Sequence, residues 1–141
     1  MGKAPIDQRP LGVGGAGALN PDEFGTFLGL ASWLMSMSKE HRDLPFSTLD
    51  SRILPAILLK QFKIIRKDTM PMAFLSWATL SDEAKAKFQK DPDSLELLDW
   101  RSGKNVVVVE CISPFGPAAE IKAGFIKELI KSQTGAAPKR N

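Results

Sequence analysis

The segment MPMAFLSWAT, residues 70–79, decides the fold that the sequence predicts. Its side chains alternate between two faces, and both faces are mainly apolar. One face carries Met72, Phe74, Ser76 and Ala78, and the other carries Ala73, Leu75 and Trp77. A strand that is apolar on both sides needs cover on each face. We therefore expect this segment to be the central strand of a sheet with helices on both sides.

Two further segments have the composition of strands. Residues 61–67, QFKIIRK, are rich in β-branched and aromatic side chains, and residues 68–69 supply the turn that leads into the central strand. Four consecutive valines at 106–109 follow a turn at residues 102–103. Such an apolar run is typical of a fully buried strand.

Helical patterns fill most of the remaining chain, at residues 21–38, 47–57, 81–90 and 118–132. The first helix begins with Asn20 as its N-cap and has Glu23 three positions later, close to a capping box. Pro55 is expected to bend or end the second helix. The apolar stripe of the last helix is Ile121, Phe125, Leu129 and Ile130. The order of these elements predicts an α/β sandwich with a mostly antiparallel sheet.

Length and composition indicate one globular domain. The 141 residues allow one core, and the content of 43% hydrophobic and 25% charged residues is ordinary. We expect a flexible arm at 1–19, which is rich in glycine, alanine and proline, a domain at 20–132 and a flexible tail at 133–141. No apolar stretch is long enough for a membrane span, and no signal peptide is visible.

Charge and cysteine content narrow the class of partner and the compartment. A net charge of +3 suggests acidic protein partners and does not call for nucleic acid. Cys111 is the only cysteine, so an internal disulfide is excluded and a reducing cytoplasm fits. Cys111 lies in an apolar strand, where a free cysteine is more often an inert filler than a nucleophile.

His41 is the only histidine in the sequence. It stands in SWLMSMSKEHRDLP, residues 32–45, where an apolar helical run turns polar before a proline. An imidazole has an ordinary pKa of about 6.5, so histidine is the residue type best suited to exchange protons near neutrality. From composition alone, a surface histidine beside a helix C-terminus is the simpler interpretation.

Four stretches of the chain change that interpretation. They are LGLASWLMSMSKEHRDLP at 28–45, ILPAILLKQF at 53–62, PMAFLSWATLS at 71–81 and DWRSGKNVVVVECISPFG at 99–116. In this order and spacing they resemble the toxin-activating lysine acyltransferases, which prepare repeats-in-toxin (RTX) cytolysins for activity. The resemblance implies a homodimer with a fold related to the GNAT-type N-acetyltransferases and a mixed, mostly antiparallel sheet. Relatives usually continue beyond the last helix, so a C-terminally short version of that fold is expected.

The resemblance also implies a reaction. An acyl group would pass from acyl carrier protein to an internal lysine of an RTX protoxin, with no bound cofactor and no metal. His41 would act as the general base or would itself take the acyl group. Glu110 occupies the place where the family carries an aspartate implicated with the histidine in catalysis. The longer glutamate keeps the carboxylate but moves it outward, and misplacement by about 1 Å costs around a hundredfold in rate.

Further candidate residues have two interpretations each. The basic residues between positions 52 and 67 form either a solvated face or a docking patch for the acidic carrier protein. They are Arg52, Lys60, Lys63, Arg66 and Lys67. Trp33 and Trp77 are either core residues or walls of an acyl pocket.

Two other functions remain open at this stage. The first is a catalytically weakened or idle member that binds an RTX protein or an acyl carrier protein, since the glutamate at 110 departs from the family pattern. The second is an ordinary small-molecule N-acetyltransferase. Coenzyme A binding without carrier-protein binding would distinguish it.

Overall fold

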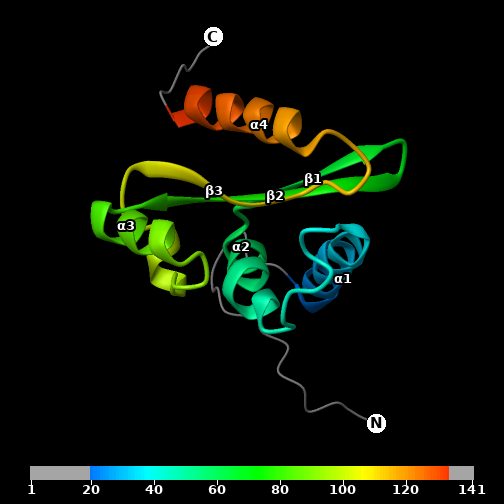
Figure 1. The fold of residues 1–141 in the computed structure, drawn as a ribbon, viewed down its shortest axis with the longest axis horizontal. Helices are drawn as coiled ribbons and strands as arrows, with labels where there is room; N and C mark the ends of the chain where they lie inside the picture. Colours follow the sequence, from blue (N-terminus) through cyan, green and yellow to red (C-terminus); the bar gives the residue numbers. More distant parts are fainter. Residues whose placement is uncertain (1–19, 134–141) are drawn as a thin grey trace.

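Three antiparallel strands form the central layer of the computed structural model, which describes residues 20–133 (Figure 1). The strands are β1 (Phe62–Lys67), β2 (Met70–Leu80) and β3 (Asn105–Ile112), in that order across the sheet. Strand β2 is therefore central, as predicted. The one parallel contact in the described part of the chain is an isolated bridge between Thr79 and Arg101.

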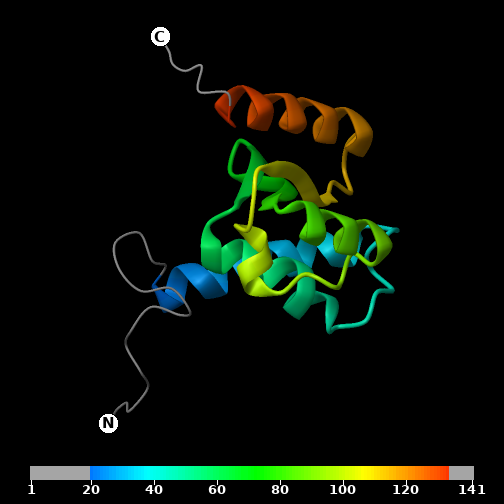
Figure 2. The same cartoon turned by 90° about the vertical axis from the view of Figure 1, so that its left-hand side faces the viewer.

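Helices cover both faces of this sheet (Figure 2). They are α1 (Pro21–Met37), α2 (Leu54–Leu59), α3 (Asp82–Lys90) and α4 (Ala118–Gln133), with short helical turns η1 (Leu49–Ile53) and η2 (Leu97–Trp100). The first three helices lie on one face and α4 lies on the other. The predicted α/β class is confirmed, and the arrangement is compatible with a small GNAT-like fold.

The alternation along β2 supplies both halves of the core. Phe74 is fully buried against α1 and α2, while its neighbour Leu75 is fully buried beneath α4. Phe125 and Leu129 complete the second cluster from α4. Truncating a buried phenylalanine to alanine costs about 3–5 kcal/mol. Each face of β2 therefore holds a substantial share of the stability.

Polar caps set where two helices begin. The Asn20 side chain accepts a hydrogen bond from the Glu23 amide at 2.8 Å, and the Glu23 carboxylate accepts one from the Asn20 amide at 3.4 Å. This capping box confirms the predicted start of α1. Ser81 caps α3 by accepting a hydrogen bond from the Ala84 amide at 3.0 Å.

Two local predictions were wrong. Val106, Val107 and Val108 are only half-buried, because β3 is an edge strand and not a central one. Ile130 of α4 is 53% exposed, since the helix turns this side chain away from the sheet. The helix expected at 47–57 is present, but it begins as the π-helical turn η1 and continues as α2 to Leu59, and Pro55 lies in the first turn of α2 and does not end the helix.

A β-bulge interrupts the pairing of β2 with β3. Ser76 pairs with Glu110 and the next residue, Trp77, pairs with Val108, so Val109 has no partner of its own. Strict alternation would place Glu110 with Val108 on the face covered by α4. The extra residue shifts the alternation and directs Glu110 towards the helices of the opposite face.

Two segments of the predicted domain organisation lie outside the described residues, so the structure does not test them. The arm expected at 1–19 and residues 134–141 of the expected tail lie outside the described residues. Within residues 20–133, no helix is both long and apolar enough to cross a membrane.

The turn before β3 requires glycine. A Cβ atom added at Gly103 would lie 2.5 Å from the Cα of Ser81, whereas Gly29 in α1 has nothing within 4 Å. We expect Gly103→Ala to lower the free energy of unfolding by about 1–3 kcal/mol, because backbone must move. Gly29→Ala is the matched control and should raise it by about 0.5–1 kcal/mol. Urea denaturation of both variants measures this, and equal stabilities would contradict the tight turn.

Candidate active site

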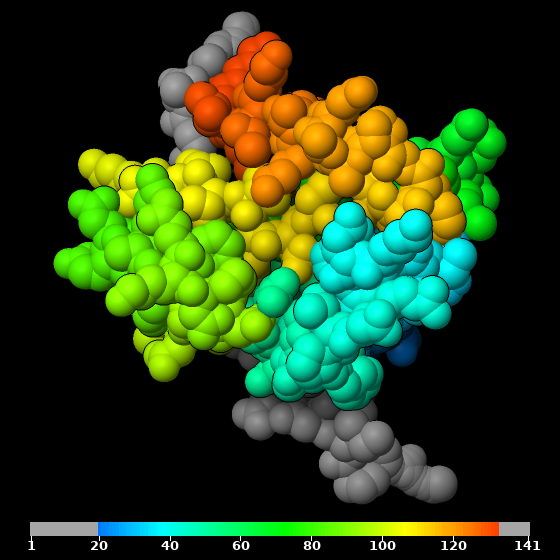
Figure 3. All heavy atoms as spheres, viewed as in Figure 1, coloured from blue at the N-terminus to red at the C-terminus, as the bar shows by residue number. Residues whose placement is uncertain are grey.

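His41 lies in a buried position on the loop that follows α1. The helix ends at Met37, and Ser38 forms the C-cap in an extended conformation. The His41 amide then donates to the Ser38 carbonyl at 3.1 Å, which curls the loop back towards the sheet. The His41 residue is only 9% exposed. In Figure 3 this loop, in cyan, lies beside the end of β3 and the start of α4, in gold and orange.

The structure brings the two predicted catalytic residues together. His41 Nε2 lies 2.8 Å from Glu110 Oε1, although the residues are 69 positions apart in the sequence. Glu110 is 7% exposed. Burial alone would raise the pKa of its carboxyl group, but hydrogen bonds from His41 and Arg52 outweigh burial and lower the pKa below the ordinary value of 4.5. Glu110 is therefore ionised at neutral pH.

The partners of His41 determine its tautomer. An ionised Glu110 only accepts hydrogen bonds, so Nε2 of His41 carries the proton and donates it to the carboxylate. Nδ1 is then the basic nitrogen, and it lies 2.6 Å from the Ser38 hydroxyl. Ser38 is 2% exposed. Ser38, His41 and Glu110 therefore form a buried hydrogen-bonded chain, and Nδ1 is the nitrogen of His41 that can accept a proton.

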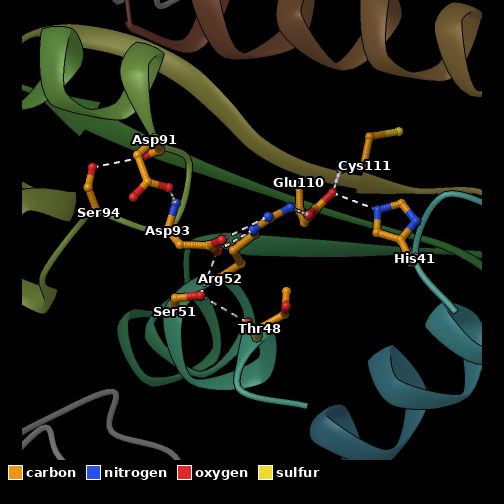
Figure 4. A network of polar contacts seen from close by, with 9 residues as sticks. All are labelled: His41, Thr48, Ser51, Arg52, Asp91, Asp93, Ser94, Glu110 and Cys111. Atoms are coloured by element: carbon orange, nitrogen blue, oxygen red, sulfur yellow. Dashed lines mark hydrogen bonds and ion pairs between the residues drawn. The ribbon is translucent and has the colours of Figure 1, made fainter. Parts of the chain in front are cut away.

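The second oxygen of Glu110 is also occupied. Arg52 Nη1 donates to Glu110 Oε2 at 2.8 Å, and the remaining edge of its guanidinium binds Asp93 at 2.6 and 3.1 Å (Figure 4). The Ser51 hydroxyl donates to the same Asp93 carboxylate at 2.8 Å. The Cys111 amide adds a longer hydrogen bond to Glu110 Oε1 at 3.2 Å. Two donors therefore bind Oε1 of the Glu110 carboxylate and one donor binds Oε2.

Two cavities meet at His41. One, of about 150 Å³, is mainly apolar. Its lining is Ser32, Met35, Ser36, His41, Arg42, Leu44, Pro45, Phe46 and Leu49. The other, of about 250 Å³, is more polar and lies between the His41 loop, β3 and α4. It is lined by Glu40, His41, Glu110, Cys111 and Lys122, among others. His41 is the residue that lines both.

The remaining predicted residues lie elsewhere. Of the five basic residues, Arg52 is turned inward to Glu110 and is 17% exposed at its side chain. The other four are exposed on or beside the edge strand β1, where Lys63 forms an ion pair with Glu128 at 3.1 Å. Their predicted role in carrier binding stays a prediction.

The two tryptophans do not line either cavity at His41. Trp33 is 38% exposed and packs against Phe115, with ring centroids 5.6 Å apart. Trp77 packs against Phe125 in the core beneath α4, at 5.7 Å. Their assignment as acyl-pocket walls stays a prediction.

Two other kinds of chemistry were considered for this site, a nucleophilic Cys111 thiol and a bound metal ion. Burial raises the pKa of the Cys111 thiol above its ordinary value. A protonated thiol is a poor nucleophile. Among residues 20–133 no cluster of three or more histidine, cysteine, aspartate or glutamate side chains is placed to hold a metal ion.

The sequence profile of the RTX toxin acyltransferase family matches residues 20–140 of this chain, which includes His41, Glu110 and all three strands. The chain belongs to the RTX toxin acyltransferase family. The resemblance inferred from the four sequence stretches is thereby confirmed.

Individual relatives match over part of the chain. The chain is 38% identical over 89 residues to a protein-lysine myristoyltransferase of Kingella kingae, which covers 63% of this chain and 53% of the relative. It is 40% identical to a protein-lysine myristoyltransferase of Escherichia coli, with 63% and 51% covered. It is 39% identical to the RTX-I toxin-activating lysine-acyltransferase of Actinobacillus pleuropneumoniae, with 74% and 63% covered. The chain thus spans about half to five-eighths of the length of these relatives.

Sequence reasoning missed two residues of the site. The sequence predicts Ser38 only as the last residue of the first helix, and its place three positions before the lone histidine is the available signal. Asp93 follows a proline in a loop that carries no periodic pattern, so nothing in the sequence connects it to Arg52. Both are identified by their hydrogen bonds to residues that were predicted.

The low pKa of Glu110 has a consequence for acid stability. The folded carboxyl binds its proton more weakly than the unfolded one, so its contribution to stability is full above the ordinary pKa of 4.5 and is lost as the pH falls through the lower folded value. We expect the melting temperature of the native chain to fall more steeply below pH 4.5 than that of Glu110→Gln. Thermal denaturation followed by circular dichroism between neutral pH and acid measures both curves.

The control for this comparison is Glu128→Gln, which removes a carboxylate from an exposed ion pair. Below pH 4.5 its melting temperature should fall as steeply as that of the native chain, because an exposed ion pair contributes little to stability. If the melting temperatures of the native chain and Glu110→Gln fall equally steeply in acid, the lowered pKa of Glu110 is contradicted.

Proposed function

We propose that this chain transfers a fatty acyl group from an acyl carrier protein thioester to the side-chain amine of internal lysines in an RTX protoxin. The observation that carries the proposal is the buried His41–Glu110 pair at the junction of two cavities. The names of the matched relatives, lysine acyltransferases and myristoyltransferases, support the reaction class.

The reaction needs a base because the acceptor amine is protonated at neutral pH, with an ordinary pKa of about 10.4. The neutral amine attacks the thioester carbonyl, a C–N bond forms, and the C–S bond breaks. His41 takes the proton that the ammonium loses and passes it to the departing thiolate, and the second proton, which the nitrogen loses as the amide forms, goes to water. A positioned base of this kind contributes about a hundred- to ten-thousandfold. Glu110 orients the imidazole and stabilises its cation.

The hydrogen bonds favour His41 as a base over His41 as an acyl carrier. A nucleophilic imidazole needs a lone pair that faces the thioester carbonyl. Nε2 is bound to Glu110, and Nδ1 lies against the Ser38 hydroxyl at 2.6 Å. Direct attack through Nδ1 requires the buried Ser38 side chain to be displaced.

The apolar cavity is the place that we assign to the acyl chain. Leu44, Phe46 and Leu49 give it an apolar lining, and His41 is part of the same lining. A cavity of about 150 Å³ accommodates a molecule the size of benzene, or roughly six carbons of a chain. A longer chain then extends past Phe46, which is 86% exposed at the rim.

The polar cavity suits the acceptor amine. Glu40, Glu110 and Lys122 line it, and the net negative charge of these three side chains attracts a lysine ammonium towards His41. In this arrangement the acyl chain and the amine approach the imidazole from different sides.

The remaining proposals concern partners and setting. Lys60, Lys63, Arg66 and Lys67 are exposed cations that suit an acidic carrier protein. We also propose a homodimer, descent from the GNAT-type fold and a cytoplasmic location. The family relationship supports the first two, and the lone cysteine supports the third.

The direct test is intact-mass analysis of an RTX protoxin after incubation with acyl-loaded carrier protein and this chain. We expect a mass gain on lysine with the native chain and a loss of at least a hundredfold in rate with His41→Ala, because the base is removed. The control Gln89→Ala alters an exposed side chain of α3 and should keep full activity. No mass gain with any acyl length, together with intact carrier binding, would favour an idle binding module.

The acyl cavity has a test of its own. Leu44→Trp fills the apolar cavity, so transfer of a myristoyl group should fall by about tenfold or more while transfer of a butyryl group is retained. Leu98→Trp adds the same side chain at a position that is 87% exposed and should change neither rate. An equal loss with both donors, or none with either, would place the acyl chain elsewhere.

A further inference from the structure

We infer that Arg52, held in place by Asp93, is the positioning residue that fixes the Glu110 carboxylate against His41. The inference rests on the proposed function for its rate effects, but its geometry and its effect on the Glu110 carboxyl are independent of the substrate. Arg52 was predicted as part of a docking patch. Its guanidinium instead lies between two carboxylates, one of them buried.

The contacts form a continuous rigid series. Asp93 binds the Nε and Nη2 edge of Arg52 through both carboxylate oxygens, which fixes the plane of the guanidinium. Ser51 and the Asp93 amide, which donates to Asp91 Oδ1 at 3.0 Å, hold Asp93 itself. Nη1 of Arg52, on the side of the guanidinium away from Asp93, binds Glu110. The direction of that last hydrogen bond is therefore set before Glu110 is reached.

The backbone beneath Arg52 has an unusual form that suits this role. Arg52 lies in the wide turn η1, where the Leu54 amide donates to the Leu49 carbonyl, five residues earlier. Pro55 has no N–H to donate to Ser51 and its ring crowds that carbonyl, so an ordinary α-helical turn is disfavoured here. The wider turn presents residues 51 and 52 together towards Asp93.

Charge balance explains why Asp93 is needed besides Arg52. Arg52 next to Glu110 alone would cancel the negative charge that stabilises a protonated imidazole. Asp93 compensates the guanidinium and has its own pKa lowered by that contact. With His41 neutral, the four side chains carry one net negative charge, and proton uptake by His41 brings the cluster to neutrality. Arg52 and Asp93, which we call the clamp, thus fix Glu110 without removing its electrostatic effect on His41.

The length of the Glu110 side chain gives a physical reason for such a clamp. Its carboxylate hangs on one more rotatable bond than that of aspartate, so it samples more positions around His41. An error of about 1 Å in a catalytic contact costs around a hundredfold in rate. Arg52 restricts Oε2, and the restriction leaves Oε1 aimed at His41 Nε2.

The test uses the full chain with Arg52→Gln and Arg52→Lys, and Lys87→Gln as a control that removes one cation from the Lys87–Asp99 pair at 2.7 Å. The first readout is the pKa of the Glu110 carboxyl, followed by ¹³C NMR with labelled glutamate. Arg52→Gln should raise it by about one pH unit or more, because an adjacent cation is lost. Arg52→Lys should keep it low, and Lys87→Gln should leave it unchanged.

The second readout is the rate of acyl transfer. Arg52→Gln and Arg52→Lys should both lower kcat by about tenfold to a hundredfold with little change in KM for the acyl donor, since lysine keeps the charge but not the planar fork. Lys87→Gln should retain the native kcat. Full activity in Arg52→Lys, or an unchanged Glu110 pKa in folded Arg52→Gln, would overturn the inference.

Failure of the proposed function gives a different result. If the native chain transfers no acyl group, the NMR titration still decides whether Arg52 holds Glu110. If Arg52→Gln does not fold, the kcat of Arg52→Lys decides, because this variant retains the charge but not the planar fork. A raised KM for the donor with unchanged kcat in Arg52→Lys would return Arg52 to its predicted role in carrier docking and would also overturn the inference.

Discussion

The carboxylate of Glu110 is the group on which the rest of the site depends. A buried charge is tolerated only when it is paired and hydrogen-bonded. Its partners come from the loop after α1, from η1 and from the backbone of β3 itself. Removing one partner of a buried ion pair costs about 3–5 kcal/mol, a large part of the about 5–15 kcal/mol that stabilises a typical domain. The contacts that hold the site therefore also join the loop after α1 and η1 to the sheet.

The sheet was the more predictable part of this molecule. Two apolar faces on residues 70–79 required a central strand, and the cap residues Asn20 and Ser81 set helix starts, because these signals are local in the chain. The valine run was harder to interpret. Its composition predicts a strand but not its neighbours, and the described sheet places it at an edge.

The site was predictable only in part, for reasons that can be named. His41 and Glu110 were found through motif context and through the cost of a carboxylate after an apolar run. Their contact depends on the bulge at Val109. Strand propensities do not indicate a bulge there, because the run of valines is compatible with a regular strand. Arg52 looked like one of five similar cations. Its difference from them lies in the turn before Pro55 and in Asp93, 41 positions away.

The glutamate at position 110 no longer indicates a weakened site once its surroundings are considered. The family resemblance implies an aspartate there, and an added methylene by itself would loosen the contact with His41. In this structure the bulge turns the side chain towards the helices, and Arg52 takes up the second oxygen. The hydrogen bond to His41 keeps a length of 2.8 Å. Side-chain length, bulge and clamp act together, so a glutamate without the arginine and its aspartate would be a different site. The observed geometry therefore supports the proposed base–carboxylate pair better than the alternative of an idle fold.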